Sequence, residues 1–241
     1  INMEKLTFDR HTSAQFNAEL EGARKHLMEM GGLVEQQIDV AFRSLMSVDT
    51  DLAAKAIKMD KDVNKMELMI DKETTHILAK RNPAASDLRF IISVTKTVND
   101  LERMGDEAAK IAKQAIELAD SGSGPQGFVE LRHIGEKVRQ MVHMSLDAFA
   151  RLDADAALSV MHQDEAVDLE YGTAIRTLVT KMMEDPRTIS RALNVMWALR
   201  SLERIGDHAR NVAESVIYLV KGKDVRHKKL DKITEQLKKL D

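Results

Sequence analysis

The sequence of 241 residues contains no cysteine, only three prolines and only 4 % aromatic residues. The absence of thiols excludes disulfide bonds, thiolate metal sites and cysteine nucleophiles, and it is typical of a reducing compartment. Proline and glycine interrupt helices, and their scarcity beside many alanines, leucines and methionines favours helix along nearly the whole chain. We therefore expect an all-α protein with an aliphatic, methionine-rich core.

Charge and hydropathy exclude two further classes of protein. The net charge of −3 gives no concentration of positive charge, so a nucleic-acid partner is not expected. No apolar run reaches the ~18–20 residues that span a bilayer. Glu4, Lys5 and Asp9 interrupt any apolar stretch near the beginning, so no signal peptide is expected. These features predict a soluble cytoplasmic protein.

The apolar residues of the first half recur at helical spacing, with interruptions that separate three helices. Thr12 or Ser13 can cap the first helix, which carries an apolar stripe from Phe16 to Leu45. Asp49 or Thr50 can cap the second. The third is expected from about residue 84 to 119, with Asn82 as its cap and Pro83 in its first turn.

The second half repeats this plan after a linker at residues 120–127, which holds three glycines and one proline. Leu152-Asp153-Ala154-Asp155 matches Val48-Asp49-Thr50-Asp51, and Asp185-Pro186 matches Asn82-Pro83. Helix breaks at corresponding places indicate an internal duplication. The sequence therefore predicts two three-helix bundles, at residues 12–119 and 128–221, and a charged tail at 222–241 containing a short helix.

The last helix of each half carries an apolar seam with alternating spacings of four and three, the rhythm of bundle packing. The two seams are Val94, Val98, Leu101, Gly105, Ala108, Ala112, Ala115 and Val195, Leu199, Leu202, Gly206, Ala209, Ala213, Val216. A glycine inside a helix costs about 1 kcal/mol relative to alanine. Its presence in both seams predicts the close approach of another backbone.

A six-residue stretch occurs once in each half and contains the candidate functional residues. Leu101-Glu102-Arg103-Met104-Gly105-Asp106 and Leu202-Glu203-Arg204-Ile205-Gly206-Asp207 each place a Glu and an Asp four residues apart. On a helix such residues share one face, beside the apolar seam. Carboxylates at this spacing can bind one hard or borderline cation, such as Mg, Ca, Mn, Fe or Zn.

The alternative is a solvated helix shoulder with ion pairs of little energetic value. Its expected partners are Arg103, Lys110, Arg204 and Arg210. Asp60 or Asp62 could complete a cation site in the first half, and Asp164 and Asp168 in the second. Asp60 and Asp62 are two residues apart and point in different directions, so at most one of them faces the site.

The sequence gives little support for an enzyme. Di-iron bundle enzymes need a Glu-x-x-His pattern on two helices. Glu73 with His76 and Glu130 with His133 have that spacing, but they are not at matching places in the two halves. We therefore attribute them to chance, and no nucleotide loop or nucleophile triad is evident. A carboxylate-bridged metal store or metalloenzyme remains the alternative hypothesis.

Beyond these patterns, the chain resembles the PhoU family of bacterial phosphate-transport and phosphate-signalling regulators. The resemblance extends over residues ~12 to ~229 and rests on the two Glu-x-x-x-Asp motifs and on four longer stretches. These stretches are Gln15-Phe16-Asn17-Ala18-Glu19-Leu20, Pro83-Ala84-Ala85-Ser86-Asp87-Leu88-Arg89, Met182-Met183-Glu184-Asp185 and Lys221-Gly222.

The resemblance implies a fold of two three-helix bundles related by a pseudo-twofold axis, in a cytoplasmic homodimer. It implies metal ions (Mg, Mn, Fe or Zn) held by Glu102, Asp106, Glu203 and Asp207. Asp100 has no acidic counterpart in the second copy, so it would be an outer ligand in the first half alone. The implied function is negative regulation of the phosphate regulon and of phosphate uptake. The implied partners are the ATPase subunit of the phosphate ABC transporter and the phosphate sensor histidine kinase, through which contact with the membrane would be indirect.

Overall fold

A computed structural model describes residues 14–122, 124 and 129–238, and every regular element within them is a helix. The helices are α1 (Ala14–Ser47), α2 (Thr50–Arg81), α3 (Ala85–Asp120), α4 (Val129–Arg151), α5 (Ala154–Glu184), the 3₁₀ turn η2 (Pro186–Thr188), α6 (Ile189–Lys221) and α7 (Leu230–Lys238). The expectation of an all-α protein is confirmed. None of these helices has a stretch that is both long and apolar enough to cross a bilayer.

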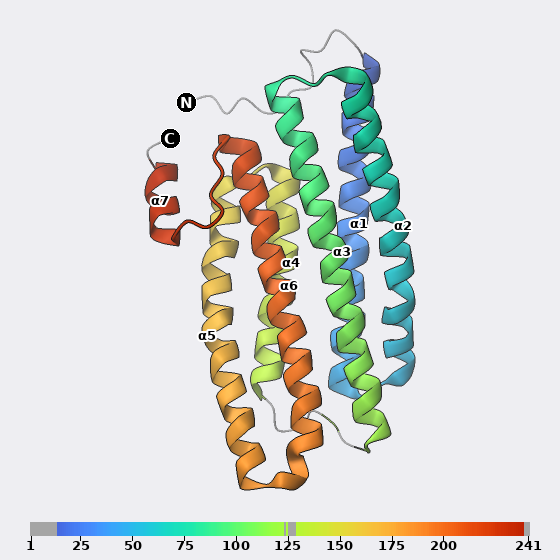
Figure 1. The fold of residues 1–241 in the computed structure, drawn as a ribbon, viewed down its shortest axis with the longest axis vertical. Coiled ribbons are helices and arrows are strands. Elements are labelled where there is room, and N and C mark those ends of the chain that lie inside the picture. Colours follow the sequence, from blue (N-terminus) through green and yellow to red (C-terminus); the bar gives the residue numbers. More distant parts are fainter. Residues whose placement is uncertain (1–13, 123, 125–128, 239–241) are drawn as a thin grey trace.

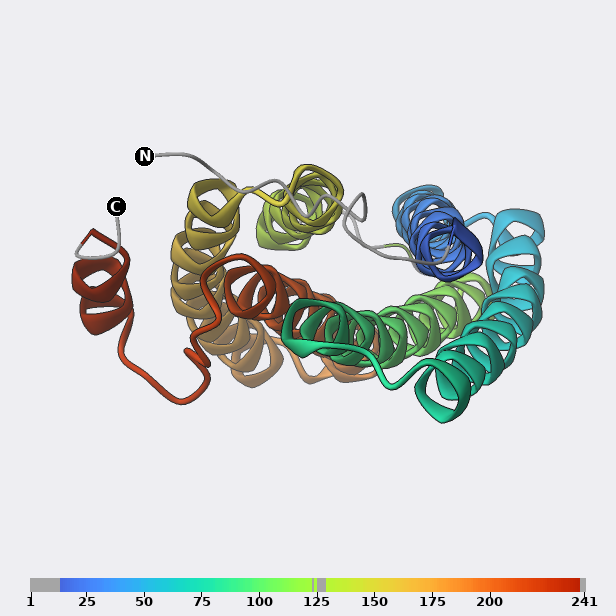
Figure 2. The same ribbon diagram turned by 90° about the horizontal axis from the view of Figure 1, so that it is seen from above.

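The six long helices form two antiparallel three-helix bundles that lie side by side (Figure 1). The first bundle consists of α1–α3 and the second of α4–α6. Seen from above, α5, α6, α3 and α2 form a curved row, with α4 and α1 packed against one side of it (Figure 2). The two halves meet mainly along α3 and α6, which pack against each other more extensively than any other pair of helices.

Contacts between α1 and α4 show that the halves are related by a pseudo-twofold axis. Gly31 and Gly135 occupy matching positions in the two halves, and so do Phe42 and Leu146. The Leu146 side chain packs on Gly31, and the Phe42 ring packs on Gly135. Reciprocal contacts of this kind are produced by a twofold relation between two similar surfaces. The implied pseudo-twofold arrangement is therefore present.

The matching helix breaks have matching local structures. Asp49 caps α2 and Asp153 caps α5, because each carboxylate accepts hydrogen bonds from two backbone N–H groups of the first turn. The residues before them, Val48 and Leu152, have φ values of 55° and 56°, in the left-handed region. The shared cap and the shared turn explain why the duplication is visible in the sequence.

The prediction for Asn82 and Pro83 is wrong in detail. Asn82 lies in the left-handed conformation that ends α2, and α3 begins only at Ala85, so Pro83 precedes the helix. Asparagine tolerates the left-handed region, and this makes it suitable as a C-terminal cap as well as an N-terminal one. In the second half Asp185 does cap the next turn, with Pro186 at its first position.

Apolar stripes fill the core as the helical periodicity predicts. The stripe of α1 is buried at Phe16, Leu20, Ala23, Leu27, Met30, Val34, Ile38, Phe42 and Leu45. Every residue of the two seams on α3 and α6 is buried as well. In the charged tail, Leu230 and Ile233 of α7 are buried beside α5, so part of the tail is attached to the second bundle.

Some predictions fall on parts of the chain that the structure does not describe. The caps at Thr12 and Ser13 lie outside the described residues, as does half of the linker at residues 120–127. The described helices on either side of that linker end at Asp120 and begin at Val129.

Candidate metal centre

The two acidic motifs lie at the middle of α3 and of α6, on either side of the pseudo-twofold axis. Glu102, Asp106 and Glu203 are half-buried and Asp207 is exposed. Their neighbours in the seam are fully buried. The motifs therefore occupy the shoulders of the bundles, as the heptad pattern predicts, and each shoulder faces the second helix of its own half.

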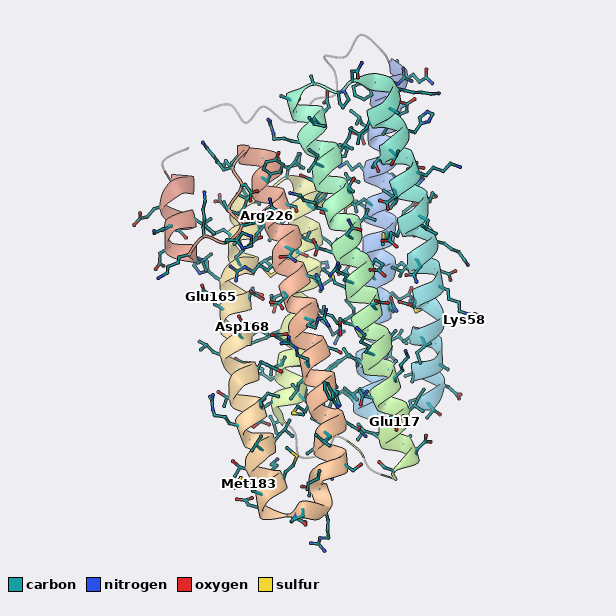
Figure 3. All side chains as sticks on the ribbon, in the orientation of Figure 1. Lys58, Glu117, Glu165, Asp168, Met183 and Arg226 are labelled. Carbon is teal, nitrogen blue, oxygen red and sulfur yellow. The ribbon has the colours of Figure 1, made fainter. Side chains whose placement is uncertain are left out.

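The second half contains a compact group of carboxylates. One oxygen each of Asp164, Asp168 and Asp207 lies within 4.8 Å of the other two. Asp164 and Asp168 come from consecutive turns of α5, and Figure 3 places Asp168 beside Glu165 on that helix. Glu203 borders the same group, because the charges of Asp207, Asp168 and Asp164 all act on its carboxyl. These residues form the second-half site.

One arginine enters the second-half site. Arg210 Nη1 donates to Asp164 Oδ2 at 3.0 Å, and Arg210 Nε donates to Glu214 Oε1 at 3.4 Å. Both carboxylates are largely removed from water, with Asp164 2 % and Glu214 11 % exposed in their side chains. The site is therefore a buried carboxylate with an internal counter-charge and two more carboxylates at its mouth.

Burial and mutual repulsion make three of the second-half carboxyls, those of Asp164, Asp168 and Glu203, easier to protonate. Burial raises the pKa of Asp164 to about 6, while the hydrogen bond from Arg210 acts in the opposite direction. Burial also raises the pKa of Asp168, and the charge of Asp207 adds to this. The pKa of Glu203 is raised by the same two causes, although Arg200 opposes them. Such carboxyls gain most from a bound cation.

The first-half site is formed by α2 and α3. Burial raises the pKa of Glu102, and the charges of Asp106, Glu67 and Asp60 raise it further. Burial and the charges of Asp71 and Asp106 raise the pKa of Glu67. Glu102, Asp106, Asp60 and Glu67 therefore share one electrostatic environment, and they form the first-half site.

A buried amide from α1 completes the first-half site. The Gln37 side chain is fully buried, and its Nε2 donates to Gly105 O at 3.0 Å, to Ala56 O at 3.2 Å and to Asp60 Oδ1 at 3.4 Å. All three partners are acceptors, and this fixes the orientation of the amide. Its Oε1 then has no hydrogen-bond partner among the described residues. A buried acceptor in this state is costly unless a ligand or water binds it.

The two motif glycines make room for side chains, which corrects the expectation of a close backbone. A Cβ on Gly105 would lie 2.9 Å from Gln37 Oε1 and 3.5 Å from Asp60 Oδ1. A Cβ on Gly206 would lie 3.6 Å from both Asp164 Oδ1 and Met141 Cε. In each half the glycine lets the acid of the second helix approach the motif. The helical pattern indicated that each glycine leaves space beside the seam, but it did not indicate that side chains fill this space.

The ion pairs expected of a solvated shoulder form only in part. Arg204 and Lys110 both bind Glu107, each at 3.0 Å, and not one of the motif acids. Among the motif acids in the described structure, Glu203 has an ion pair, with Arg200 at 2.7 Å. Arg210 does bind an acid of the site, Asp164.

The expectations for the accompanying aspartates have different outcomes. Asp60 faces the first-half site, whereas Asp62 binds Lys65 on the surface, so one of the two is involved as predicted. Asp164 and Asp168 both belong to the second-half site. Asp100, expected as an outer ligand, accepts hydrogen bonds from His208 and Asn211 of α6 instead. Two residues along a helix correspond to 200°, and this turns Asp100 away from Glu102.

Sequence reasoning missed Glu67 and Gln37, and it assigned Arg210 only to the surface. Glu67 lies seven residues after Asp60, two turns along the same face, so heptad spacing could have revealed it. Gln37 is a polar residue within an apolar stripe, and this position could have indicated a buried polar contact. The pairing of Arg210 with Asp164 joins two helices, and no spacing within one helix predicts it.

The Glu-x-x-His patterns belong to other contacts. His26 lies 2.9 Å from Glu73, and His133 lies 3.0 Å from Glu170. Neither pair includes an acid of the two sites, which agrees with their interpretation as chance matches.

The donor atoms of both sites fit a hard or borderline cation. They are carboxylate and amide oxygens, the ligands preferred by Mg, Mn and Fe, with Zn also compatible. Each site also contains a buried oxygen without a hydrogen-bond partner among the described residues, Gln37 Oε1 in the first half and Glu203 Oε2 in the second. Both are acceptors, which a cation would satisfy. The identity of the metal remains a prediction.

Comparison with known proteins assigns this chain and its fold to a family. The family model for the PhoU domain matches the chain twice, at residues 27–115 and 131–216. The chain belongs to the PhoU family. The two matched segments contain the first and second acidic motifs respectively, so the duplication inferred from the helix breaks is a duplication of the PhoU domain.

Named PhoU proteins are similar along almost their whole length. The phosphate-specific transport system accessory protein PhoU homolog of Pseudomonas putida is 60 % identical over 237 residues, covering 98 % of this chain and 92 % of that protein. The phosphate-specific transport system accessory protein PhoU of Escherichia coli is 46 % identical over 225 residues, covering 93 % of each. These names describe accessory proteins rather than enzymes, so the prediction that the chain is not an enzyme is confirmed.

Two solved PhoU structures share the fold. The crystal structure of PhoU from Pseudomonas aeruginosa has 61 % sequence identity and a TM-score of 0.85, covering 87 % of this chain and all of that one. The phosphate transport system regulatory protein PhoU from Streptococcus pneumoniae has 30 % identity and a TM-score of 0.80, covering 88 % and 99 %.

Proposed function

We propose that this protein is a negative regulator of the phosphate regulon and of phosphate uptake. It acts as a non-enzymatic adaptor that links the ATPase subunit of the phosphate ABC transporter to the phosphate sensor histidine kinase, at the cytoplasmic face of the membrane. The observation that carries the proposal is the similarity, over 98 % of the chain, to a phosphate-specific transport system accessory protein. When phosphate is plentiful, the adaptor holds the kinase in its inactive mode and limits transport.

The two acidic sites hold metal ions in this proposal, and the working form is a homodimer. Glu102 and Asp106 bind a cation together with Asp60 and Glu67, and Glu203 and Asp207 do so with Asp164 and Asp168. A bound cation supplies positive charge that neutralises the repelling carboxylates. It thereby joins α2 to α3 and α5 to α6 on the shoulders of the bundles, where a partner can recognise the resulting surface.

Deletion of the gene should derepress phosphate-responsive genes in high phosphate, because the kinase loses the adaptor that inactivates it. A reporter fused to such a promoter measures this effect, in a strain shown to have no second copy of the gene. Normal repression in the deletion strain would disprove the regulatory role.

Complementation then separates regulation from metal binding. The adaptor proposal with functional metal sites expects that Glu102→Gln/Asp106→Asn fails to restore repression and loses bound metal in elemental analysis. If this variant restores full repression, the metal ion at that site has no part in regulation. A metal store, the alternative hypothesis, predicts normal repression in the deletion strain together with a lower cellular metal content.

An exposed apolar row on α6 supports a protein-binding role. Ile189, Leu193 and Trp197 follow one another at four-residue spacing, and Trp197 is 57 % exposed. Met183 at the end of α5 is 79 % exposed (Figure 3). Exposed apolar rows that contain tryptophan are typical of protein interfaces. We assign this row to the transporter ATPase subunit, because the similar accessory proteins are named for the transport system.

Trp197→Ala should weaken binding of the ATPase subunit at least tenfold, since a buried interface tryptophan commonly contributes more than 1.4 kcal/mol. Pull-down or calorimetry with the purified subunit measures this. Leu78→Ala, which changes an exposed apolar residue of α2, is the control and should bind normally. Equal binding by Trp197→Ala and the control would remove the row from the interface.

A further inference from the structure

Among the differences between the two acidic sites, two concern groups that lie directly against an acid of the second helix. On the third helix of each half, Arg210 of the second half corresponds to Ala109 of the first. On the first helix, Gln37 of the first half corresponds to Met141 of the second. Each site has four carboxylates, but one of them comes from a different position on the second helix, since Glu67 corresponds to Tyr171 and Asp168 corresponds to Asn64.

No ion pair to the acids of the first-half site is present among the described contacts, although the charge of Arg103 acts on Glu102. The buried Oε1 of Gln37, which lacks a partner, lies beside Asp60 in the space left by Gly105. A cation that enters this site has the buried amide oxygen and Asp60 beside it, and it must draw the other carboxylates inward, because no three of the first-half carboxylates have oxygens within 4.8 Å of one another in the described structure. The corresponding position in the second half holds the apolar methyl group of Met141.

The second-half site already contains positive charge. Arg210 donates to the buried Asp164 at 3.0 Å, and Arg200 donates to Glu203 at 2.7 Å. Asp164 is the most buried member of the trio with Asp168 and Asp207. A metal ion that binds this trio must displace the guanidinium from Asp164, or must share the carboxylate with a positive charge a few ångströms away.

Arg210 has a second carboxylate to which it can move. Its Nε donates to Glu214 Oε1 at 3.4 Å, one turn further along α6. The guanidinium can therefore release Asp164 and keep an ion pair, while Asp164 accepts the metal ion.

We propose that Arg210 is an internal counter-cation that competes with metal ions for Asp164, so that the first-half site fills at a lower metal concentration than the second. This inference rests on the metal binding proposed above. It makes Arg210 the residue that sets the metal affinity of the second-half site, and it gives the protein three states: empty, half-loaded and fully loaded.

Titration of the metal-free protein with Mn²⁺ tests this order. Isothermal calorimetry should show two phases, and native mass spectrometry should show one bound metal equivalent before the next. Glu102→Gln/Asp106→Asn should abolish the tighter phase, and Asp168→Asn/Asp207→Asn the weaker one. The reverse assignment would overturn the proposed order.

Arg210→Met should tighten the weaker phase by about tenfold, since it removes a unit positive charge next to a ligand. The tighter phase should be unchanged. Glu214→Gln should have the opposite effect on the weaker phase, because Arg210 then keeps Asp164 as its remaining partner. Arg187→Gln removes a positive charge from the exposed turn at Asp185 and is the charge-matched control. Circular dichroism verifies that each variant is folded.

The outcomes separate this inference from the proposal on which it depends. If the wild-type protein binds no Mn²⁺ at all, metal binding itself fails. If two phases occur and Arg210→Met leaves the weaker one unchanged or weaker, the counter-cation role of Arg210 is wrong while metal binding stands.

Discussion

In a buffer free of divalent cations, the free energy of unfolding should rise as the pH falls from 8 to about 5. Most proteins lose stability toward acid, because their carboxylates are better stabilised in the folded state. Here several carboxylates of the two sites have the opposite pKa shift. Burial raises the pKa of Asp164 to about 6, compared with an ordinary value of 3.8. The pKa values of Glu102, Glu67, Asp168 and Glu203 are raised as well.

The sign follows from proton binding in the two states. Between pH 6 and pH 3.8 the folded protein holds a proton on Asp164 that the unfolded chain has released, so lowering the pH through this window stabilises the fold. This contribution of Asp164 to the free energy of unfolding is lost as the pH rises through 6. A difference of about two pKa units corresponds to about 3 kcal/mol once the pH is below 3.8, and about 1.4 kcal/mol of this is gained by pH 5. The acids with lowered pKa values, such as Asp224 at about 2, stay ionised above pH 5 and do not change the direction.

Urea unfolding at a series of pH values measures this dependence. Asp164→Asn should flatten the curve between pH 8 and pH 5, whereas Asp62→Asn should leave it unchanged, since Asp62 binds Lys65 on the surface and has a lowered pKa. Addition of Mn²⁺ should stabilise the protein more at pH 8 than at pH 5, because protons and metal ions compete for the same oxygens. A stability that falls steadily from pH 8 to pH 5 without metal would contradict the electrostatic description of both sites.

The sequence predicts the features of this protein that depend on one helix at a time. Periodicity gave the buried seams of α3 and α6, and the recurring Asp49 and Asp153 marked corresponding helix starts. Four-residue spacing correctly put Glu102 and Asp106 on a common face. Each of these follows from the geometry of a single helix, which is fixed by local hydrogen bonds.

Features that depend on two or three helices were not predictable in this way. Gln37 of α1 reaches Asp60 of α2 and Gly105 of α3. Arg210 of α6 reaches Asp164 of α5. A glycine in a seam indicates that space is needed beside the helix. Whether a backbone, an amide or a carboxylate fills this space depends on the register of the neighbouring helices. The charge of each site is set by those neighbours, so the difference between the two sites became visible only in the folded structure.

The contact between α1 and α4 leads to a second large effect, on stability. Gly135→Ala should destabilise the protein by about 2 kcal/mol, within the usual range for overpacking. A Cβ at this position would lie 2.1 Å from Phe42 Cε2 and 2.6 Å from Phe42 Cζ. Phe42 is buried, and its ring also lies 5.6 Å from the guanidinium of Arg139, so it has little freedom to move.

Gly32→Ala is the matched control, since Gly32 is also within a helix and has no described atom within 4 Å of the added Cβ. It should stabilise the protein by about 1 kcal/mol, the usual gain of alanine over glycine in a helix. Urea unfolding would therefore separate the two variants by about 3 kcal/mol, the difference between the loss and the gain. Equal stability of the two variants would show that the halves do not pack closely at Gly135.

The equivalent contact in the other half suggests a second substitution that should restore stability to the Gly135→Ala variant. Leu146 occupies the position that corresponds to Phe42, and it packs on Gly31 with a closest distance of 2.8 Å from the added Cβ, compared with 2.1 Å at Phe42. Leucine is smaller and more flexible than the phenyl ring, so Phe42→Leu should make room for the added methyl group.

Phe42→Leu alone should cost about 1 kcal/mol through the cavity it leaves. The double variant Gly135→Ala/Phe42→Leu should then be more stable than the sum of the single changes predicts, and strict additivity would rule out the steric explanation. Because this contact joins the two bundles, the coupling energy measures the steric interaction across the junction of α1 and α4.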